Sequence, residues 1–158
     1  RLAYKIINSS TSLLPAWKAI MVNFDLVERV IPRDVRTRWN SAYDMIHFAL
    51  EHRQVVDAFT YDFKNGVYSF RLDAAEWKIL TNLDDILADA TLFFSRDGIK
   101  SSLAAVIPVM DDIDCMLTTA EHDTKRPRAI RAAVTIAKRT LNRYYQLTDS
   151  SDVYRIAM

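Results

Sequence analysis

The sequence predicts a mainly α-helical fold: an array of about five to six helices with one short extended segment near residues 30–38. Three observations lead to this prediction. The 158 residues include only two glycines, Gly66 and Gly98, whereas an all-β fold usually needs more for its tight hairpin turns. Half of the residues are hydrophobic, which is enough for a buried core. Along successive segments, apolar residues recur three, four and seven positions apart, the spacing of an amphipathic helix.

The N-terminal half alternates between helical patterns and breaks. Residues 2–7 are typical of the end of a helix, and the Ser/Thr run at 9–12 is typical of a break. The next helix presents one apolar face through Trp17, Ile20, Met21 and Phe24. Because the residue before a proline avoids the helical region, Pro32 predicts an extended segment at residues 31–38.

A long helix is expected from about residue 39 to residue 64, and four further helices after it. The long helix begins with a possible capping box, Ser41-x-x-Asp44, and ends at Gly66. The next helix begins with a capping box at Asp73-x-x-Glu76, continues to about Arg96 and stops at Gly98. The one after it begins at Ser101 or Ser102, with a kink or a late start at Pro108. Another helix holds Pro127 in its first turn, and a last one begins near Asp152.

Composition excludes several classes of protein. No apolar run approaches the ~18 residues of a membrane span, so we expect a soluble chain without a membrane partner. The lone cysteine, Cys115, can form neither an internal disulfide nor a CxxC zinc site, so we expect the protein to be intracellular. We expect the Cys115 thiol itself to be buried and inert. No nucleotide-binding fingerprint or Ser/His/Asp arrangement is present. Both ends stop in mid-pattern, so we expect residues 1–158 to be a single helical region from a longer protein.

Charge is segregated along the chain. Residues 1–72 carry a net charge of +3, residues 73–124 a net charge of −8 and residues 125–158 a net charge of +6. The acidic zone could hold a divalent metal or form a solvated face, and we predict no metal site there. In the last basic zone, Arg131 and Lys138 belong to a helical stripe that either contacts phosphates or is simply solvated.

The most unusual segment runs from Arg33 to Ser41 and places three arginines before a tryptophan. Guanidinium groups pair well with phosphates, and an indole ring can stack on an unpaired base. Asn40 and Ser41 add polar groups near a helix N-terminus, which itself favours phosphate. The alternative is that Trp39 is a buried anchor and that the arginines pair with nearby acids. Local chemistry leaves both interpretations open.

Several motifs, in the right order along nearly the whole chain, resemble those of hAT-superfamily DNA transposases. The run Asp34-Val-Arg-Thr-Arg-Trp-Asn-Ser41 with Tyr43-Asp-Met45 resembles the signature D-V-x-T-R-W-N-S-x-Y-x-M-L, although Ile46 replaces its final leucine. Further blocks that resemble the family, the first in its fungal versions, are residues 7–17, 76–87, 91–95, 140–151 and 153–157.

The resemblance implies a parent DNA transposase whose RNase H-like catalytic core is interrupted by this helical insertion. The parent would be a nuclear homo-oligomer that cuts and joins transposon ends with Mg²⁺ held by three carboxylates. The resemblance places those carboxylates outside this segment, so the chain itself would be non-catalytic and would hold no cofactor. Carried over from the family's Arg-Trp pair, Trp39 would stack on a flipped base and Arg38 would lie on the DNA backbone.

The sequence therefore predicts a DNA-binding helical part of a cut-and-paste transposase, in contact with transposon ends and with the rest of the transposase chain. Two alternatives are a domesticated relative that keeps the helices for protein–protein or regulatory DNA contacts, and a plain interaction module with Trp39 in its core. The predicted DNA-contacting residues are Arg36, Arg38, Trp39, Asn40, Ser41, Arg131 and Lys138.

Overall fold

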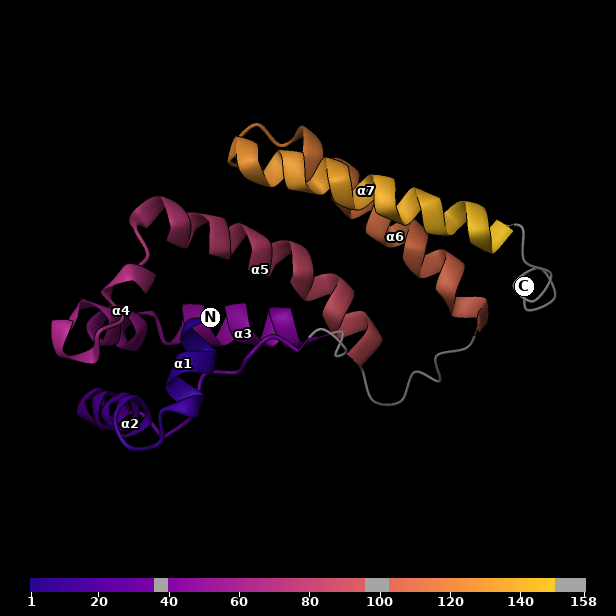
Figure 1. Ribbon diagram of the computed structural model, residues 1–158. Helices are drawn as coiled ribbons and strands as arrows, with labels where there is room; N and C mark the ends of the chain where they lie inside the picture. The colour runs from indigo at the N-terminus through magenta and orange to yellow at the C-terminus, as the bar shows by residue number, and fades with distance from the viewer. Residues whose placement is uncertain (36–39, 96–102, 150–158) are drawn as a thin grey trace. The chain divides into compact units, whose positions relative to one another are not determined.

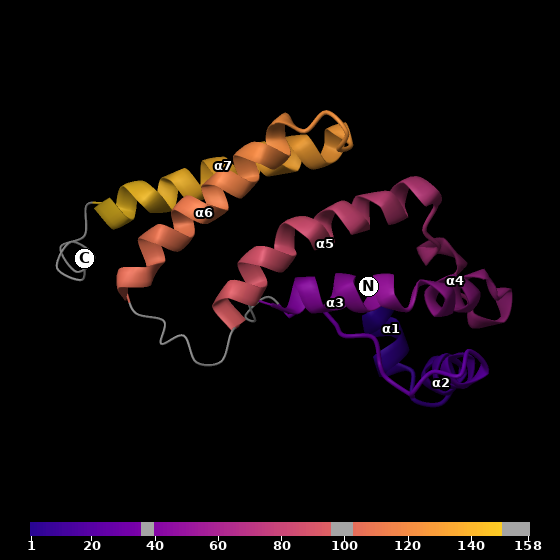
Figure 2. The same ribbon diagram turned by 180° about the vertical axis from the view of Figure 1, so that it is seen from behind.

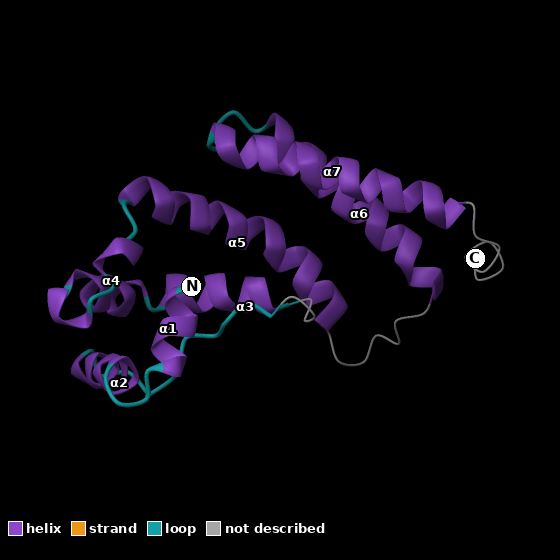
Figure 3. Cartoon of the chain, in the orientation of Figure 1, coloured by secondary structure: helices purple, strands orange, loops and turns teal. Residues whose placement is uncertain are grey.

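The chain folds into helices joined by loops. The computed structural model describes residues 1–35, 40–95 and 103–149, and within these ranges it contains seven α-helices, two short 3-10 helices and no strand (Figure 3). The elements are α1 (Leu2–Asn8), α2 (Leu13–Asn23), α3 (Ser41–Glu51), α4 (Arg53–Tyr61), η1 (Phe63–Asn65), η2 (Tyr68–Phe70), α5 (Ala74–Ser95), α6 (Leu103–His122) and α7 (Arg128–Asp149). The predicted mainly α-helical fold is confirmed.

Contacts divide the chain into two compact units, residues 1–84 and residues 85–158, with the boundary inside α5 (Figure 1). In the first unit, α1, α2 and α4 surround a core of large apolar side chains. Trp17 is fully buried and meets the edge of Phe59 at a centroid distance of 5.4 Å. Its indole N–H donates to the Arg29 carbonyl at 2.9 Å, which satisfies its polar group and ties the loop after α2 to the core.

Trp77 brings the start of α5 into the same core. It is buried, and its indole N–H donates to the Asp57 carboxylate at 3.1 Å. The Arg53 guanidinium lies 5.0 Å from the indole ring and 3.5 Å from Asp57, so a cation covers the ring while pairing with the same carboxylate. Burying a large apolar side chain is worth about 1.5–3 kcal/mol, so the two tryptophans contribute much of the stability of this unit.

The expected long helix from residue 39 to residue 64 is wrong, because the chain breaks at His52 into α3 and α4. There the His52 ring stacks on Phe48 at 4.0 Å and its Nδ1 lies 3.0 Å from the Phe48 carbonyl, which also accepts from the His52 backbone N–H. A straight helix over 41–61 would be about 30 Å long. The break instead lets α4 turn and pack against α2. Neither proline nor glycine marks this break in the sequence.

The two predicted capping boxes have opposite outcomes. The box at Asp73 is confirmed: Asp73 accepts from the Glu76 N–H at 2.8 Å and Glu76 accepts from the Asp73 N–H at 2.9 Å. The box at Ser41 is wrong. Ser41 is the first residue inside α3, with Asn40 at the N-cap position, and the Ser41 hydroxyl bonds back to the preceding loop.

In the second unit, α6 and α7 form an antiparallel helical hairpin (Figures 1 and 2). Its apolar seam contains Met110 and Leu117 from α6 with Ile130 and Val134 from α7, all buried. The spacing of Ile130 and Val134, one helical turn, puts both on the same face of α7. Polar bridges border the seam, including one from the Tyr145 hydroxyl to the Asp111 carboxylate.

Three smaller expectations have mixed outcomes. Cys115 is exposed, so the prediction of a buried thiol is wrong; it lies on the face of α6 away from the seam. Phe24, expected on the apolar face of the helix with Trp17, is exposed, and α2 ends before it at Asn23. Pro108 lies inside α6, which begins at Leu103 rather than late. The expected boundaries at residues 98, 101–102 and 152 lie outside the described residues.

Candidate nucleic-acid interface

The predicted contact residues near α3 are only partly within the described structure. Residues 36–39, and with them Arg36, Arg38 and Trp39, lie outside the described residues. Asn40 occupies the N-cap position of α3, and Ser41 begins the helix. The roles assigned to these residues therefore stay predictions, while the residues on either side show how this part of the chain is held.

Hydrogen bonds of Ser41 join the residues on either side of the interval 36–39. Ser41 is 6% exposed, and its hydroxyl accepts from the Val35 N–H at 2.8 Å. The hydroxyl lies 3.0 Å from both the Asp34 carboxylate and the Val35 carbonyl, to either of which it can donate its proton. Residues 34–35 and residue 41 are consequently side by side. Ile31 is also buried, so the stretch leading to Val35 is anchored in the core of the first unit.

A shallow hollow of about 360 Å³ adjoins these hydrogen bonds of Ser41. Its lining residues are Arg1, Ala3, Tyr4, Arg33, Asp34, Val35 and Met45. Two guanidinium groups and one carboxylate border it, and Asp34 is already bonded to Ser41. Arg1, Tyr4 and Arg33 are exposed, so cations and one aromatic ring face solvent next to the entrance to α3. Sequence reasoning missed Arg1 and Tyr4, because only the fold brings α1 beside residues 33–35.

A second polar arrangement that the sequence did not indicate lies farther along α3. His47 Nδ1 is 3.2 Å from the Asp84 carboxylate, and His47 Nε2 is 3.7 Å from Glu51. Tyr43 stacks on the imidazole at 5.3 Å. Burial, followed by the nearby Asp84 charge, raises the pKa of the Tyr43 hydroxyl. This group links α3 to α5 and is accounted for as a structural contact, since each of its members has a partner.

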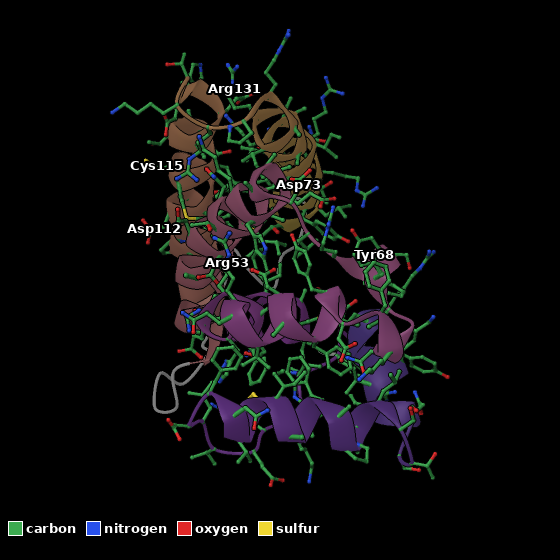
Figure 4. The ribbon with its side chains drawn as sticks, turned by 90° about the vertical axis from the view of Figure 1, so that its left-hand side faces the viewer. Arg53, Tyr68, Asp73, Asp112, Cys115 and Arg131 are labelled. Atoms are coloured by element: carbon green, nitrogen blue, oxygen red, sulfur yellow. The ribbon has the colours of Figure 1, made fainter. Side chains whose placement is uncertain are left out.

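The two predicted contacts on α7 lie in different surroundings. Lys138 reaches across to α6, where its ammonium donates to Thr118 at 2.7 Å and lies 3.4 Å from Glu121. Arg131 is half-buried near the start of α7 (Figure 4). The Thr135 hydroxyl donates to Glu121 at 2.7 Å, and this bond, with help from Lys138, lowers the pKa of Glu121. Lys138 is thus engaged in holding the hairpin together, and its contact with DNA stays a prediction.

Among the described residues, no three His, Cys, Asp or Glu side chains lie together in a group that could hold a metal ion. None of the described helices is long and apolar enough to cross a membrane.

Comparison with known proteins identifies the family. Residues 1–86 match the family model described as the ZBED1 RNase-like helical domain. The match ends two residues beyond the first compact unit, so it covers that unit as a whole. A search of curated proteins and a search of solved structures each found no match. This family is hAT-related and derived from transposases, so its identification agrees with the ordered motifs noted in the sequence. The chain belongs to the ZBED1 RNase-like helical domain family.

Proposed function

We propose that this chain is the DNA-contacting helical region of a hAT-type cut-and-paste transposase. In this proposal Arg36, Arg38, Trp39 and Asn40 contact transposon-end DNA where it is distorted into a hairpin, and Ser41, whose hydroxyl is bonded to Asp34 and Val35, positions them. The observation that carries the proposal is the set of hydrogen bonds at Ser41, which joins the two ends of the interval that contains the Arg-Trp pair. Membership of a hAT-related family supports it.

The proposed mechanism is the stabilisation of a flipped base. Extruding a base from a duplex costs a few kcal/mol, and stacking on an aromatic ring returns about 1–3 kcal/mol per base. In the proposal Trp39 supplies that ring and Arg38 binds the adjacent phosphate. Arg1 and Arg33 line the hollow next to the hydrogen bonds of Ser41. They extend the cationic surface along the DNA backbone. The partial positive charge at the N-terminus of α3 adds to it.

The rest of the proposal concerns the parent protein. The catalytic carboxylates, their Mg²⁺ and the assembly into a homo-oligomer belong to parts of a nuclear transposase other than this segment, which is inserted into its RNase H-like core. Cutting and joining are therefore not assigned to any residue of this chain. Its part is to hold the DNA in the bent, unpaired form on which the core acts.

A second candidate function is protein binding by a domesticated relative, and one observation favours it. On α7, Ile136, Tyr144 and Leu147 are exposed, Ile136 to 64%. Their spacing of eight and three residues keeps them near one helical face, away from the seam with α6. An exposed apolar stripe of this kind is typical of a surface that binds another chain. The parent reading frame separates the two candidates, since three intact carboxylates favour a transposase and substituted ones favour a binding protein.

Binding to hairpin DNA with an unpaired base tests the proposal. Trp39→Ala is expected to weaken binding about 5- to 140-fold, the equivalent of one lost base stack. Arg38→Ala is expected to weaken it as well, while Phe24→Ala, which removes an exposed ring elsewhere in the same unit, leaves the affinity unchanged. Circular dichroism must show that each variant remains folded. A folded Trp39→Ala variant that binds as well as the parent chain contradicts the proposed function.

A further inference from the structure

A cluster of exposed aromatic rings and one arginine lies at the C-terminal end of α4 and in the segment that follows it. This aromatic cluster consists of Tyr61, Phe63, Tyr68 and Arg71. Phe63 stacks on Tyr68 at a centroid distance of 4.6 Å and an interplanar angle of 16°. The Arg71 guanidinium lies 5.1 Å from the Tyr61 ring and 4.8 Å from the Tyr68 ring, and donates to the Tyr68 hydroxyl at 2.7 Å. Phe63 and Tyr68 thus form a stack beside the Arg71 guanidinium, and the Tyr61 ring stands edge-on to Tyr68 at a centroid distance of 6.4 Å and an interplanar angle of 89°.

The rings are exposed although the backbone beneath them is well anchored. The Asp62 carboxylate accepts from the Lys64 N–H at 2.9 Å, and the Asn65 side chain donates to the Phe59 carbonyl at 2.9 Å. Gly66 adopts the left-handed conformation (φ 61°) that turns the chain, and Val67 is buried directly after it. Phe63 is nevertheless 74% exposed. The outward position of its ring is therefore fixed by the fold and is not the result of a loose loop.

The aromatic cluster is separate from the predicted interface at the start of α3. The cluster begins at the C-terminal end of α4, beyond the C-terminal end of α3, whereas the hydrogen bonds of Ser41 lie at the N-terminal end of α3 (Figure 1). The 11 residues of α3 alone span about 16 Å. Figure 4 shows Tyr68 on the segment between α4 and α5. A ligand at the cluster would therefore use contacts that the Arg-Trp pair does not supply.

We propose that the aromatic cluster is a second nucleic-acid contact, a platform on which bases of single-stranded DNA stack. Tyr68 covers one face of Phe63, and the exposure of Phe63 leaves its other face open for a base to extend the stack. Arg71 uses one N–H for Tyr68, which leaves others of its five N–H donors for a phosphate. Lys64 adds a second cation beside the rings, while the Asp62 carboxylate is bonded to the backbone.

These contacts match single-stranded DNA better than an acidic peptide. Flat, open rings accept any base, because every base has a π-face, whereas recognition of a peptide carboxylate depends on its pairing with Arg. The charges within residues 61–71 are Lys64 and Arg71 against Asp62, which is complementary to a phosphate backbone. The proposal goes beyond the proposed function, since it assigns a contact to residues outside the Arg-Trp segment.

Binding of a fluorescent thymidine 15-mer to the full 158-residue chain tests this inference. Phe63→Ala is expected to weaken binding roughly tenfold, the effect of losing about one base stack. Arg71→Lys keeps the charge but loses the planar guanidinium, so its affinity should fall between those of the parent chain and Arg71→Ala. Val27→Ala and Lys78→Ala are matched controls, an exposed apolar residue and an exposed cation elsewhere, and should leave the affinity unchanged.

Photo-crosslinking of a DNA strand that carries 5-bromo-2′-deoxyuridine gives an independent result. The expected crosslinks map to residues 61–71 and disappear in Phe63→Ala. The inference is overturned if the crosslinks are confined to other residues, or if the Phe63→Ala and Arg71→Ala variants bind the 15-mer like the controls. It is also overturned if an acidic peptide binds through the cluster and displaces the strand. Trp39→Ala distinguishes this inference from the proposed function: it should lose affinity for hairpin DNA while keeping the crosslinks at the cluster.

Discussion

Replacing Ser41 by alanine should destabilise the first unit, because its hydroxyl closes the base of the loop that precedes α3. The residue is 6% exposed and its Oγ accepts the Val35 N–H at 2.8 Å. It also donates toward the Asp34 carboxylate at 3.0 Å. Alanine removes both bonds and leaves the Val35 N–H without this acceptor.

The expected loss is about 1–2 kcal/mol. A typical hydrogen bond contributes about 0.5–1.5 kcal/mol and one to a charged group about 1.5–3 kcal/mol. The Asp34 bond counts for less than that range, because Asp34 is exposed and water can replace the hydroxyl. For a unit of 60–100 residues such a loss lowers Tm by roughly 5–15 °C.

Urea and thermal unfolding of the Ser41→Ala variant measure this loss. Tryptophan fluorescence is a suitable probe, because Trp17 and Trp77 both lie in the core of the first unit. The matched control is Ser12→Ala: Ser12 is exposed and makes no capping bond at the start of α2, so its loss should cost less than about 0.5 kcal/mol. If the two variants are equally stable, the hydrogen bonds of Ser41 do not hold the loop that precedes α3, and the proposed function loses its main structural support.

Three further predictions concern the core and the hairpin. Trp17→Ala should cost about 3–5 kcal/mol and unfold the first unit in circular dichroism, whereas Phe24→Ala should not. The pKa of Glu121 is lower in the folded chain than its ordinary value of 4.5, so its contribution to stability is present above that pH and is lost as pH falls through the lower, folded value. Thermal unfolding from about pH 7 to about pH 3 should therefore show a smaller acid loss in Glu121→Gln than in the parent chain. Replacing Arg131 and Lys138 by glutamine should reduce the salt dependence of DNA binding by about 0.9 in logarithmic slope per lost phosphate contact; an unchanged slope would remove α7 from the interface.

Local patterns predicted those parts of the fold that depend on local chemistry. The periodicity of Trp17 and Met21, and of Ile130 and Val134, identified buried faces because one face of a helix must be apolar to pack. The Asp73 capping box was predictable for a similar reason, since its donors and acceptors are three residues apart.

Features set by tertiary contacts could not be predicted in this way. At the break at His52, the imidazole stacks on Phe48 and α4 packs against α2, and no proline or glycine marks the position. Ser41 had the spacing of a cap, but its hydroxyl found partners six and seven residues earlier in the chain. Cys115 lies in an apolar-rich segment, yet the seam with α7 uses another face of α6.

The candidate site shows the same division. The Arg-Trp segment was found from its sequence because its motif is contiguous. The hollow beside it combines α1 with residues 33–35, and the aromatic cluster combines rings from α4, η1 and η2, so both depend on how the chain folds back on itself. Only a run of aromatic residues at positions 59–70 signalled the cluster in the sequence, and such residues more often belong to a core.

Fluorescence of 2-aminopurine, placed at the unpaired position of hairpin DNA, measures whether Trp39 stacks on that base. Stacking quenches this fluorophore, so the parent chain should quench it on binding and Trp39→Phe should keep part of the effect. A folded Trp39→Ala variant, held at a concentration that saturates the DNA, should leave the fluorescence high. Equal quenching by the parent chain and by Trp39→Ala would contradict the claim.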